Sequence, residues 1–196
     1  MLKALFKKAT FTLSAPNHRI LPEDSGAEVA FVGRSNAGKS STLNALCGQN
    51  IAKTSKTPGR TQAINVFSLN EQQRLIDLPG YGFAKTSLAM RHSWDQMITE
   101  YLEKRQSLKG LVIITDVRHD LKPSDLAMID WSNQHQIPHL VLLNKVDKIS
   151  KNKQMSSLSR CQKQWPHSLF LLSSAQHKTG INDLMHQCYQ WLSDST

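Results

Sequence analysis

Short runs of apolar residues along the chain predict six β-strands. A strand buried on both faces of a sheet is a continuous apolar run, whereas a strand with one solvent face alternates apolar and polar residues. Residues 28–33, 111–116 and 139–144 follow the first pattern, and residues 63–69 follow the second. The predicted strands are 28–33, 63–69, 74–78, 111–116, 139–144 and 168–173.

Helical spacing of apolar residues predicts helices between these strands. Trp94, Ile98 and Tyr101 recur at helical spacing, which indicates a stripe that faces the core. Pro123 has a position that fits the first turn of another helix. The predicted helices are 39–47, 91–106, 123–135, 150–164 and 181–192.

The order of these elements predicts an α/β fold. Strands that alternate with helices form a mostly parallel sheet with helices on both faces. Strands 63–69 and 74–78 are joined by a short polar turn, so we expect a hairpin that adds one antiparallel edge strand to a six-stranded sheet. We expect residues 28–196 to form one domain and residues 1–27 to be an N-terminal extension packed on it.

The chain is basic, with a net charge of +9 and a pI of about 9.6. Such a charge favours a polyanionic partner such as RNA or DNA, although many basic proteins bind no nucleic acid. The basic residues that are candidates for contacts with RNA could equally form a solvated helix face. They are Lys3, Lys7, Lys8, Lys148, Lys151, Lys153, Arg160 and Lys163.

The cysteines and the hydropathy of the chain indicate the kind of cellular compartment in which the protein works. Cys47, Cys161 and Cys188 are dispersed and odd in number, which suits a reducing cytoplasm rather than a disulfide framework. The sequence has no run of about 18 apolar residues, so we expect no membrane span. Nothing in the sequence demands more than a monomer.

Residues 33–40 fit the pattern Gly-x-x-x-x-Gly-Lys-Ser and predict a phosphate-binding loop. Its glycines let the backbone approach phosphate closely, and its amides point at the β-phosphate. Lys39 would reach the β- and γ-phosphate oxygens, and the Ser40 hydroxyl would bind Mg²⁺. The predicted strand before this loop and the predicted helix after it supply the required context.

Residues 144–147, Asn-Lys-Val-Asp, predict which base is bound. They follow a buried strand, where an open sheet places its ligand crevice. The Asp147 carboxylate can accept hydrogen bonds from guanine N1–H and N2–H₂, which adenine does not offer. Asn144 can reach the N7 edge of the base and help fix the loop, while the Lys145 stem can lie over the purine face.

Two further segments complete the predicted nucleotide site. In residues 77–80, Asp77 would hold the Mg²⁺ shell through a water, and the Gly80 amide would bond the γ-phosphate. In residues 173–175, the Ala175 amide could donate to guanine O6. A threonine should complete the Mg²⁺ shell, and Thr54, Thr57 and Thr61 are the candidates.

Together with residues 57–62, Thr-Pro-Gly-Arg-Thr-Gln, these motifs resemble the EngB (YihA/YsxC) family of bacterial GTPases. The resemblance extends over about residues 20–193 and includes residues 101–106 and 116–119. It implies a Ras-like P-loop GTPase fold within the TrmE-Era-EngA-EngB-Septin-like superfamily. It also implies a switch role in assembly of the large ribosomal subunit, with GTP and GDP as ligands, and a requirement in cell division and septation.

The resemblance selects Thr61 as the metal-ligating threonine and Gly59–Ala63 as the first switch. Lys39, Thr61 and Gly80 are then the predicted catalytic residues. The predicted nucleotide-binding residues are Gly33, Arg34, Ser35, Asn36, Ala37, Gly38, Lys39, Ser40, Ser41, Gly59, Arg60, Thr61, Gln62, Ala63, Asp77, Leu78, Pro79, Gly80, Asn144, Lys145, Val146, Asp147, Ser173, Ser174 and Ala175.

The hydrolytic step departs from the Ras pattern. A glutamine that orients water in Ras-like proteins is replaced here by Tyr81, so we expect slow intrinsic hydrolysis. Asn36 resembles the asparagine of potassium-activated bacterial GTPases, although asparagine also simply tolerates a left-handed turn. Arg60 could approach the phosphates or contact RNA. The alternative function is an RNA- or ribosome-binding assembly factor whose nucleotide is mainly structural, and an ATP-using kinase is disfavoured by residues 144–147.

Overall fold

The computed structural model describes residues 2–53, 63–81 and 88–194, with backbone only for residues 88–95. Within these residues seven strands form one sheet in the order β1-β3-β4-β2-β5-β6-β7. The strands are β1 (Thr10–Ala15), β2 (Ala27–Gly33), β3 (Ile64–Ser68), β4 (Gln73–Asp77), β5 (Leu108–Asp116), β6 (His139–Asn144) and β7 (Leu169–Leu172).

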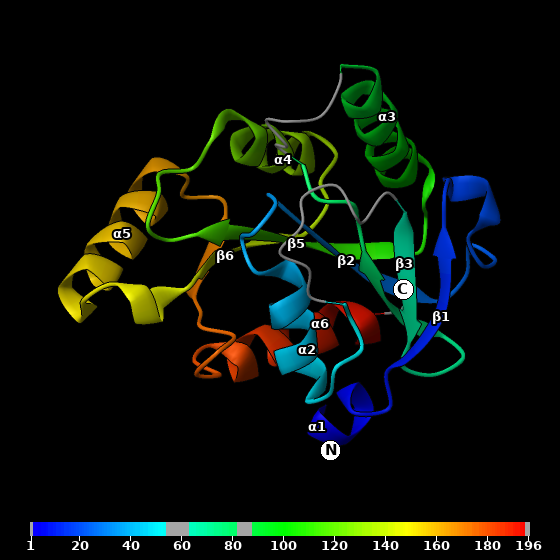
Figure 1. Cartoon of the computed structure of the whole chain (residues 1–196), viewed down its shortest axis with the longest axis horizontal. Coiled ribbons are helices and arrows are strands. Elements are labelled where there is room, and N and C mark those ends of the chain that lie inside the picture. The colour runs from blue at the N-terminus through cyan, green and yellow to red at the C-terminus, as the bar shows by residue number, and fades with distance from the viewer. Residues whose placement is uncertain (1, 54–62, 82–87, 195–196) are drawn as a thin grey trace.

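Helices cover both faces of this sheet, as predicted (Figure 1). Helices α1, α2 and α6 pack on one face, and α3, α4 and α5 pack on the other. The helices are α1 (Leu2–Phe6), α2 (Lys39–Cys47), α3 (Leu88–Lys104), α4 (Pro123–Gln134), α5 (Lys151–Gln164) and α6 (Ile181–Ser193), with single 3-10 turns η1 (His18–Ile20) and η2 (Val146–Lys148). No helix in the described ranges has both the length and the apolar character needed to cross a bilayer.

Alternation along the central strands divides the core into two layers. In β2, Val29 and Phe31 pack with α2 and α6, while Ala30 and Val32 face α3 and α4 on the other side. All seven residues of β2 are buried, which explains the continuous apolar run in the sequence. The sheet is therefore a two-sided platform, and the residues at the carboxyl ends of its strands are held by a packed core.

The predicted strand count was too low by one, because β1 was not recognised. β1 pairs antiparallel with β3, so β3 is an inner strand and the edge of the sheet is β1. Most β1 side chains are exposed, and Phe11 is 56% exposed although its ring meets Phe67 edge-on at 5.9 Å. The alternation of Phe11, Leu13 and Ala15 with polar residues was the signal that could have identified this strand.

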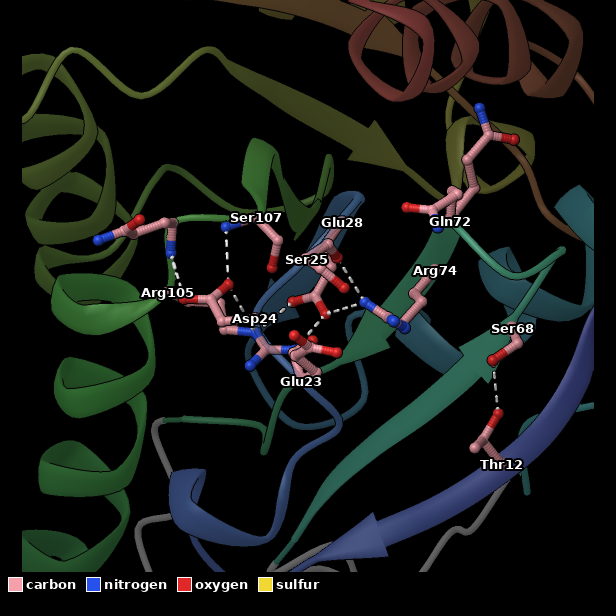
Figure 2. Close-up of polar contacts among 12 residues, drawn as sticks. Thr12, Glu23, Asp24, Ser25, Glu28, Ser68, Gln72, Arg74, Arg105 and Ser107 are labelled. Atoms are coloured by element: carbon pink, nitrogen blue, oxygen red, sulfur yellow. Dashed lines mark hydrogen bonds and ion pairs between the residues drawn. The ribbon is translucent and has the colours of Figure 1, made fainter. Parts of the chain in front are cut away.

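A buried charge cluster lies at the end of the sheet where β2 begins (Figure 2). The Glu28 carboxylate is fully buried and accepts hydrogen bonds from Arg105 Nη2 at 2.7 Å, Arg105 Nε at 3.0 Å and Tyr101 Oη at 2.9 Å. Arg74 Nη1 approaches it at 3.4 Å and also donates to the Ser25 carbonyl at 2.7 Å. The cluster thus joins β2, β4 and the end of α3.

Asp24 extends this cluster to the start of β5. Its two carboxylate oxygens accept from the backbone amides of Gln106 and Ser107, both at 2.9 Å. Partial burial raises the pKa of Asp24, but hydrogen bonds from Ser107 and Gln106 and the nearby Arg105 bring the pKa below its usual value. The segment between α3 and β5 is therefore fixed by the ionised carboxylate of Asp24.

Candidate nucleotide-binding site

Four of the predicted nucleotide segments meet at one end of the sheet. Residues 33–41, 77–80, 144–147 and 173–175 follow β2, β4, β6 and β7, which are parallel neighbours or near neighbours. Backbone hydrogen bonds hold them at this edge: Leu78 N donates to Phe31 O of β2 at 3.0 Å, and Val146 N donates to Ser173 O at 3.1 Å. The carboxyl edge of a parallel sheet is where open α/β folds bind ligands.

The loop between β2 and α2 has the backbone geometry expected of a phosphate-binding loop. Gly38 has φ +103°, and a Cβ at this position would lie 2.3 Å from Asn144 Nδ2. Asn36 has φ +64°, a left-handed conformation that asparagine tolerates. The α2 N-terminus directly follows Gly38, so its free amides lie where an anionic group would be favoured.

Lys39 and Asp77 form a buried ion pair at the centre of this edge. Lys39 Nζ donates to Asp77 Oδ1, and the two side chains are 9% and 4% exposed. The other carboxylate oxygen accepts from Asn65 Nδ2 at 3.3 Å. The two residues assigned from sequence to the phosphates and to the metal shell are thus direct neighbours.

Asn144 connects the phosphate-binding loop to the loop after β7. Its Nδ2 donates to the Ala37 carbonyl at 2.9 Å, and its Oδ1 accepts from the Ala175 amide at 3.4 Å. Lys145 Nζ donates to the Asn36 carbonyl and lies 2.9 Å from Asp116 Oδ2. Asn144 and Lys145 therefore hold the phosphate-binding loop in place through hydrogen bonds to its carbonyl groups.

The Asp147 carboxylate is kept ionised by its neighbours. Its Oδ1 accepts from Ser174 Oγ at 2.7 Å, and its Oδ2 lies 3.0 Å from Lys148 Nζ. The hydrogen bond from Ser174, followed by the one from Lys148, holds the pKa of Asp147 below its usual value. An ionised carboxylate accepts hydrogen bonds and cannot donate one, so this position suits a ligand edge rich in N–H groups.

Tyr81, which replaces the expected glutamine, is directed toward α4. Its Oη donates to Asp125 Oδ1 at 2.7 Å, and the residue is 7% exposed. Burial, together with the charge of Asp125, raises the pKa of Tyr81 well above its usual value. The other Asp125 oxygen accepts from the Lys122 amide at 2.8 Å, so Asp125 caps α4 and anchors Tyr81 at once.

Two acidic residues of this region were not given a role from the sequence. The sequence predicts only that Asp125 belongs to a helix, because no local pattern indicates its hydrogen bond with the distant Tyr81. Asp116 ends β5 and contacts both Lys145 and Arg118. Partial burial raises the pKa of Asp116, yet hydrogen bonds from Arg118 and Lys145 hold it well below its usual range. Its place at the end of a buried strand was the available signal.

Some predicted residues lie outside the described part of the chain. These are Thr54, Thr57, Gly59, Arg60, Thr61 and Gln62. Ala63 is described and immediately precedes β3, in which Asn65 pairs with Asp77. The assignment of Thr61 as a metal ligand and the roles of the remaining site residues stay predictions.

Comparison with known protein families and relatives identifies the chain's class. A family model described as "50S ribosome-binding GTPase" matches residues 28–145. A protein of Colwellia psychrerythraea called "Probable GTP-binding protein EngB" is 57% identical over 157 residues, covering 80% of this chain and 70% of the relative. A protein of the same description from Shewanella piezotolerans is 52% identical over 81% of this chain and 72% of the relative.

Solved structures share the fold. A crystal structure of a probable GTP-binding protein EngB has a TM-score of 0.70 at 22% identity and covers 85% of this chain and 98% of that one. Aquifex aeolicus Era bound to GDP and AlF4⁻ has a TM-score of 0.71 at 23% identity, over 88% of this chain and 58% of that one. With the family model and the more than 50% identical relatives, we conclude that the chain belongs to the EngB family of GTP-binding proteins and is a GTPase.

Proposed function

We propose that this protein is a slow, Mg²⁺-dependent GTPase switch that acts in the assembly of the large ribosomal subunit and is needed for normal cell division and septation. The observation that carries the nucleotide part is the ionised Asp147, held by Ser174 and Lys148 next to the loop that Asn144 braces. The ribosomal part is supported by the description of the matching family model and by the net charge of +9.

The residue roles follow from the positions at the sheet edge. Residues 33–41 surround the phosphates, with Lys39 on the β- and γ-phosphates, and residues 144–147 with 173–175 surround the guanine. Asp147 accepts from N1–H and N2–H₂, and the Ala175 amide donates to O6. Gly80 and Gly59–Ala63 contact the γ-phosphate side of the ligand. Residues 28–196 are the G domain, and residues 1–27 are an N-terminal extension. The strand β1 of this extension pairs with β3 and so adds an edge strand to the sheet of the G domain.

The oxygen atoms at this edge fit a magnesium ion. Ser40 lies in the first turn of α2 and Asp77 ends β4, so a hydroxyl and a carboxylate, ligand types that Mg²⁺ prefers, lie at this edge. Because the Asp77 oxygens already accept from Lys39 and Asn65, a role for Asp77 through a water fits better than direct coordination. We assign Ser40 and Thr61 as direct ligands and Asp77 as a ligand through water. When bound, the ion neutralises charge on the phosphate oxygens.

Slow hydrolysis follows from the engagement of Tyr81. Tyr81 stands at the sequence position of the water-orienting glutamine, but its hydroxyl group donates a hydrogen bond to Asp125 instead. Lys39 and the loop amides still stabilise charge on the transferred group. We therefore place the intrinsic rate no higher than the ~10⁻⁴ s⁻¹ scale of unassisted Ras.

Potassium is proposed as an activating ion at Asn36, an exposed residue of the phosphate-binding loop. An arginine finger on the transferred phosphate group accelerates hydrolysis by about 10³–10⁵-fold, and a potassium ion held by Asn36 would take the place of such a finger. Single-turnover hydrolysis should therefore be at least about tenfold faster in K⁺ than in Na⁺. Asn36→Ala should remove that difference, whereas Asn133→Ala on α4 should keep it. Equal rates in both salts would show that Asn36 serves only the left-handed turn.

Binding to the large ribosomal subunit is the test of the biological role. Purified subunits or their precursors are sedimented with the protein in GDP or in a non-hydrolysable GTP analogue. A switch should co-sediment several-fold more with one nucleotide than with the other. Binding of the same strength with either nucleotide, and without any, would favour the alternative role of an assembly factor whose nucleotide is structural. No co-sedimentation would remove the ribosomal role.

The cysteines bear on the cellular location. Cys47, Cys161 and Cys188 are all buried and unpaired, which suits a reducing compartment, and we propose a cytoplasmic location.

We also propose that the protein acts as a monomer. Gel filtration at micromolar concentration is the check, and a species of twice the mass would contradict it.

A further inference from the structure

The helix α5 has basic side chains and no acidic ones. Lys151, Lys153, Arg160 and Lys163 belong to it and are all exposed. Arg160 is 60% exposed and pairs with Asp120 at 2.5 Å, an exposed ion pair that contributes little to folding. The helix therefore places a positive field on one side of the molecule, away from α1 (Figure 1).

A groove runs between α5 and the loop that joins β5 to α4. It consists of two adjoining cavities of about 490 and 320 Å³, both lined by Val117, His119, Asp120, Ser157 and Arg160. The larger cavity is also lined by Arg118, Lys122 and Lys153. Four cationic side chains thus line the larger cavity, and two of them are paired with carboxylates, Arg160 with Asp120 and Arg118 with Asp116.

The groove continues toward the nucleotide-binding loop. A third cavity of about 260 Å³ shares Arg118, His119 and Asp120 with the larger one and is lined on its far side by Asn36. Arg118 Nη2 lies 2.7 Å from Asp116 Oδ2, the same oxygen that Lys145 approaches at 2.9 Å. A ligand on Arg118 would therefore compete with a carboxylate that also holds Lys145.

We propose that this groove binds the phosphate backbone of RNA, an inference that rests on the proposed ribosomal role and assigns the contacting face. Cations that line a groove together with hydroxyl groups such as those of Ser156 and Ser157 match a phosphodiester chain with its 2′-hydroxyls. The contacts are made to the backbone, so binding is governed by charge and shape more than by base sequence.

The surroundings of the groove do not favour a protein or a membrane as its occupant. The large hydrophobic side chains that are exposed in the described chain are Phe11, Ile20, Met155 and Leu169. Only Met155 among these four lies on α5. Protein interfaces concentrate aromatic anchors at their centre, and membrane-surface helices need an apolar face. Most of the apolar lining of the groove, Leu121, Leu126, Leu143 and Trp165, belongs to the smaller cavity, whereas the larger cavity has the cationic side chains that RNA requires.

Charge reversal in the groove provides the test. Lys153→Glu with Arg160→Glu is compared with Lys7→Glu with Lys8→Glu, which changes the net charge by the same amount near α1. Affinity for purified large-subunit ribosomal RNA should fall at least about tenfold in the groove variant at 0.15 M salt, and by less than about threefold in the control. The log–log salt slope should decrease by about 2. GDP affinity should be unchanged in both.

Each other outcome overturns the assignment. Equal losses in both variants would mean a diffuse charge effect, and a larger loss in the control would place the contacts near α1. A groove variant that kept its affinity for RNA but lost binding to the subunit would indicate an acidic protein segment of the subunit as the occupant. If the unmodified protein bound neither RNA nor subunits, the proposed ribosomal role would fail. If both variants still bound the subunit, the groove would not be the contact surface, but the proposed ribosomal role would stand.

Discussion

Asp147→Asn should convert the protein from a guanine-binding to a xanthine-binding one. The carboxylate accepts from two N–H groups of guanine, whereas an asparagine amide offers one donor that suits the O2 atom of xanthine. Losing one charge-assisted hydrogen bond and placing the asparagine N–H against the guanine N2–H₂ donor together cost about 2–5 kcal/mol. GDP affinity should therefore fall between about 30- and 5,000-fold, while affinity for xanthosine diphosphate rises. Displacement of a fluorescent GDP analogue measures both.

The surroundings of Asp147 make this variant informative. Ser174 Oγ at 2.7 Å and Lys148 Nζ at 3.0 Å orient the side chain, and an asparagine retains the carbonyl oxygen that Ser174 bonds. The fold should therefore persist, with a free energy of unfolding unchanged to within about 0.5 kcal/mol. Asp130→Asn, an exposed change on α4, is the matched control and should leave both affinities alone. Wild-type GDP affinity in Asp147→Asn would contradict the assignment of the base site.

Glu28→Gln should destabilise the protein by about 3–5 kcal/mol. Breaking a buried ionic cluster by neutralising one member leaves the charges of its partners uncompensated. Glu28 is fully buried and its carboxylate is shared by Arg105, Arg74 and Tyr101. The amide of glutamine would direct an N–H group at one of these donors. Urea unfolding should show a lower midpoint with a similar m-value.

An exposed glutamate provides the comparison for this variant. Glu71→Gln, in the turn between β3 and β4, should change the free energy of unfolding by less than about 0.5 kcal/mol. Glu28 lies at the opposite end of β2 from the phosphate-binding loop, so GDP affinity of the folded Glu28→Gln protein should match the wild type. Equal stability of the two variants would mean that the cluster contributes no more than a surface pair.

The placement of the predicted nucleotide motifs at the ends of strands could be predicted because their sequence patterns are local. The spacing of Gly33, Gly38 and Lys39 is set by one loop wrapping around phosphate, and Gly38 indeed has the positive φ that this requires. The prediction for Asp147 is local in the same way, because it rests on the four-residue motif and on the buried strand β6 that precedes it. Buried strands could also be predicted, because β2, β5 and β6 are mostly apolar and their buried polar residues, such as Glu28 and Asn144, lie near their ends.

Pairings between distant residues could not be predicted in this way. Glu28 contacts a residue 77 positions away, and Tyr81 contacts one 44 positions away. Neither partner alters the hydrophobic pattern around the other. β1 was not recognised because an edge strand keeps most of its side chains in solvent and so lacks a strong apolar signal. The sheet topology, not the local sequence, determines which side chains meet.

Competition between GDP and ADP for the unmodified protein in Mg²⁺ most directly tests guanine recognition by Asp147. A site whose acceptor needs the N–H groups of guanine rejects a base that lacks them by about 10⁴–10⁵-fold. GDP should therefore displace a fluorescent guanine nucleotide at a concentration lower by about that factor than ADP. Displacement by ADP at a similar concentration would contradict base recognition by the segment that follows β6.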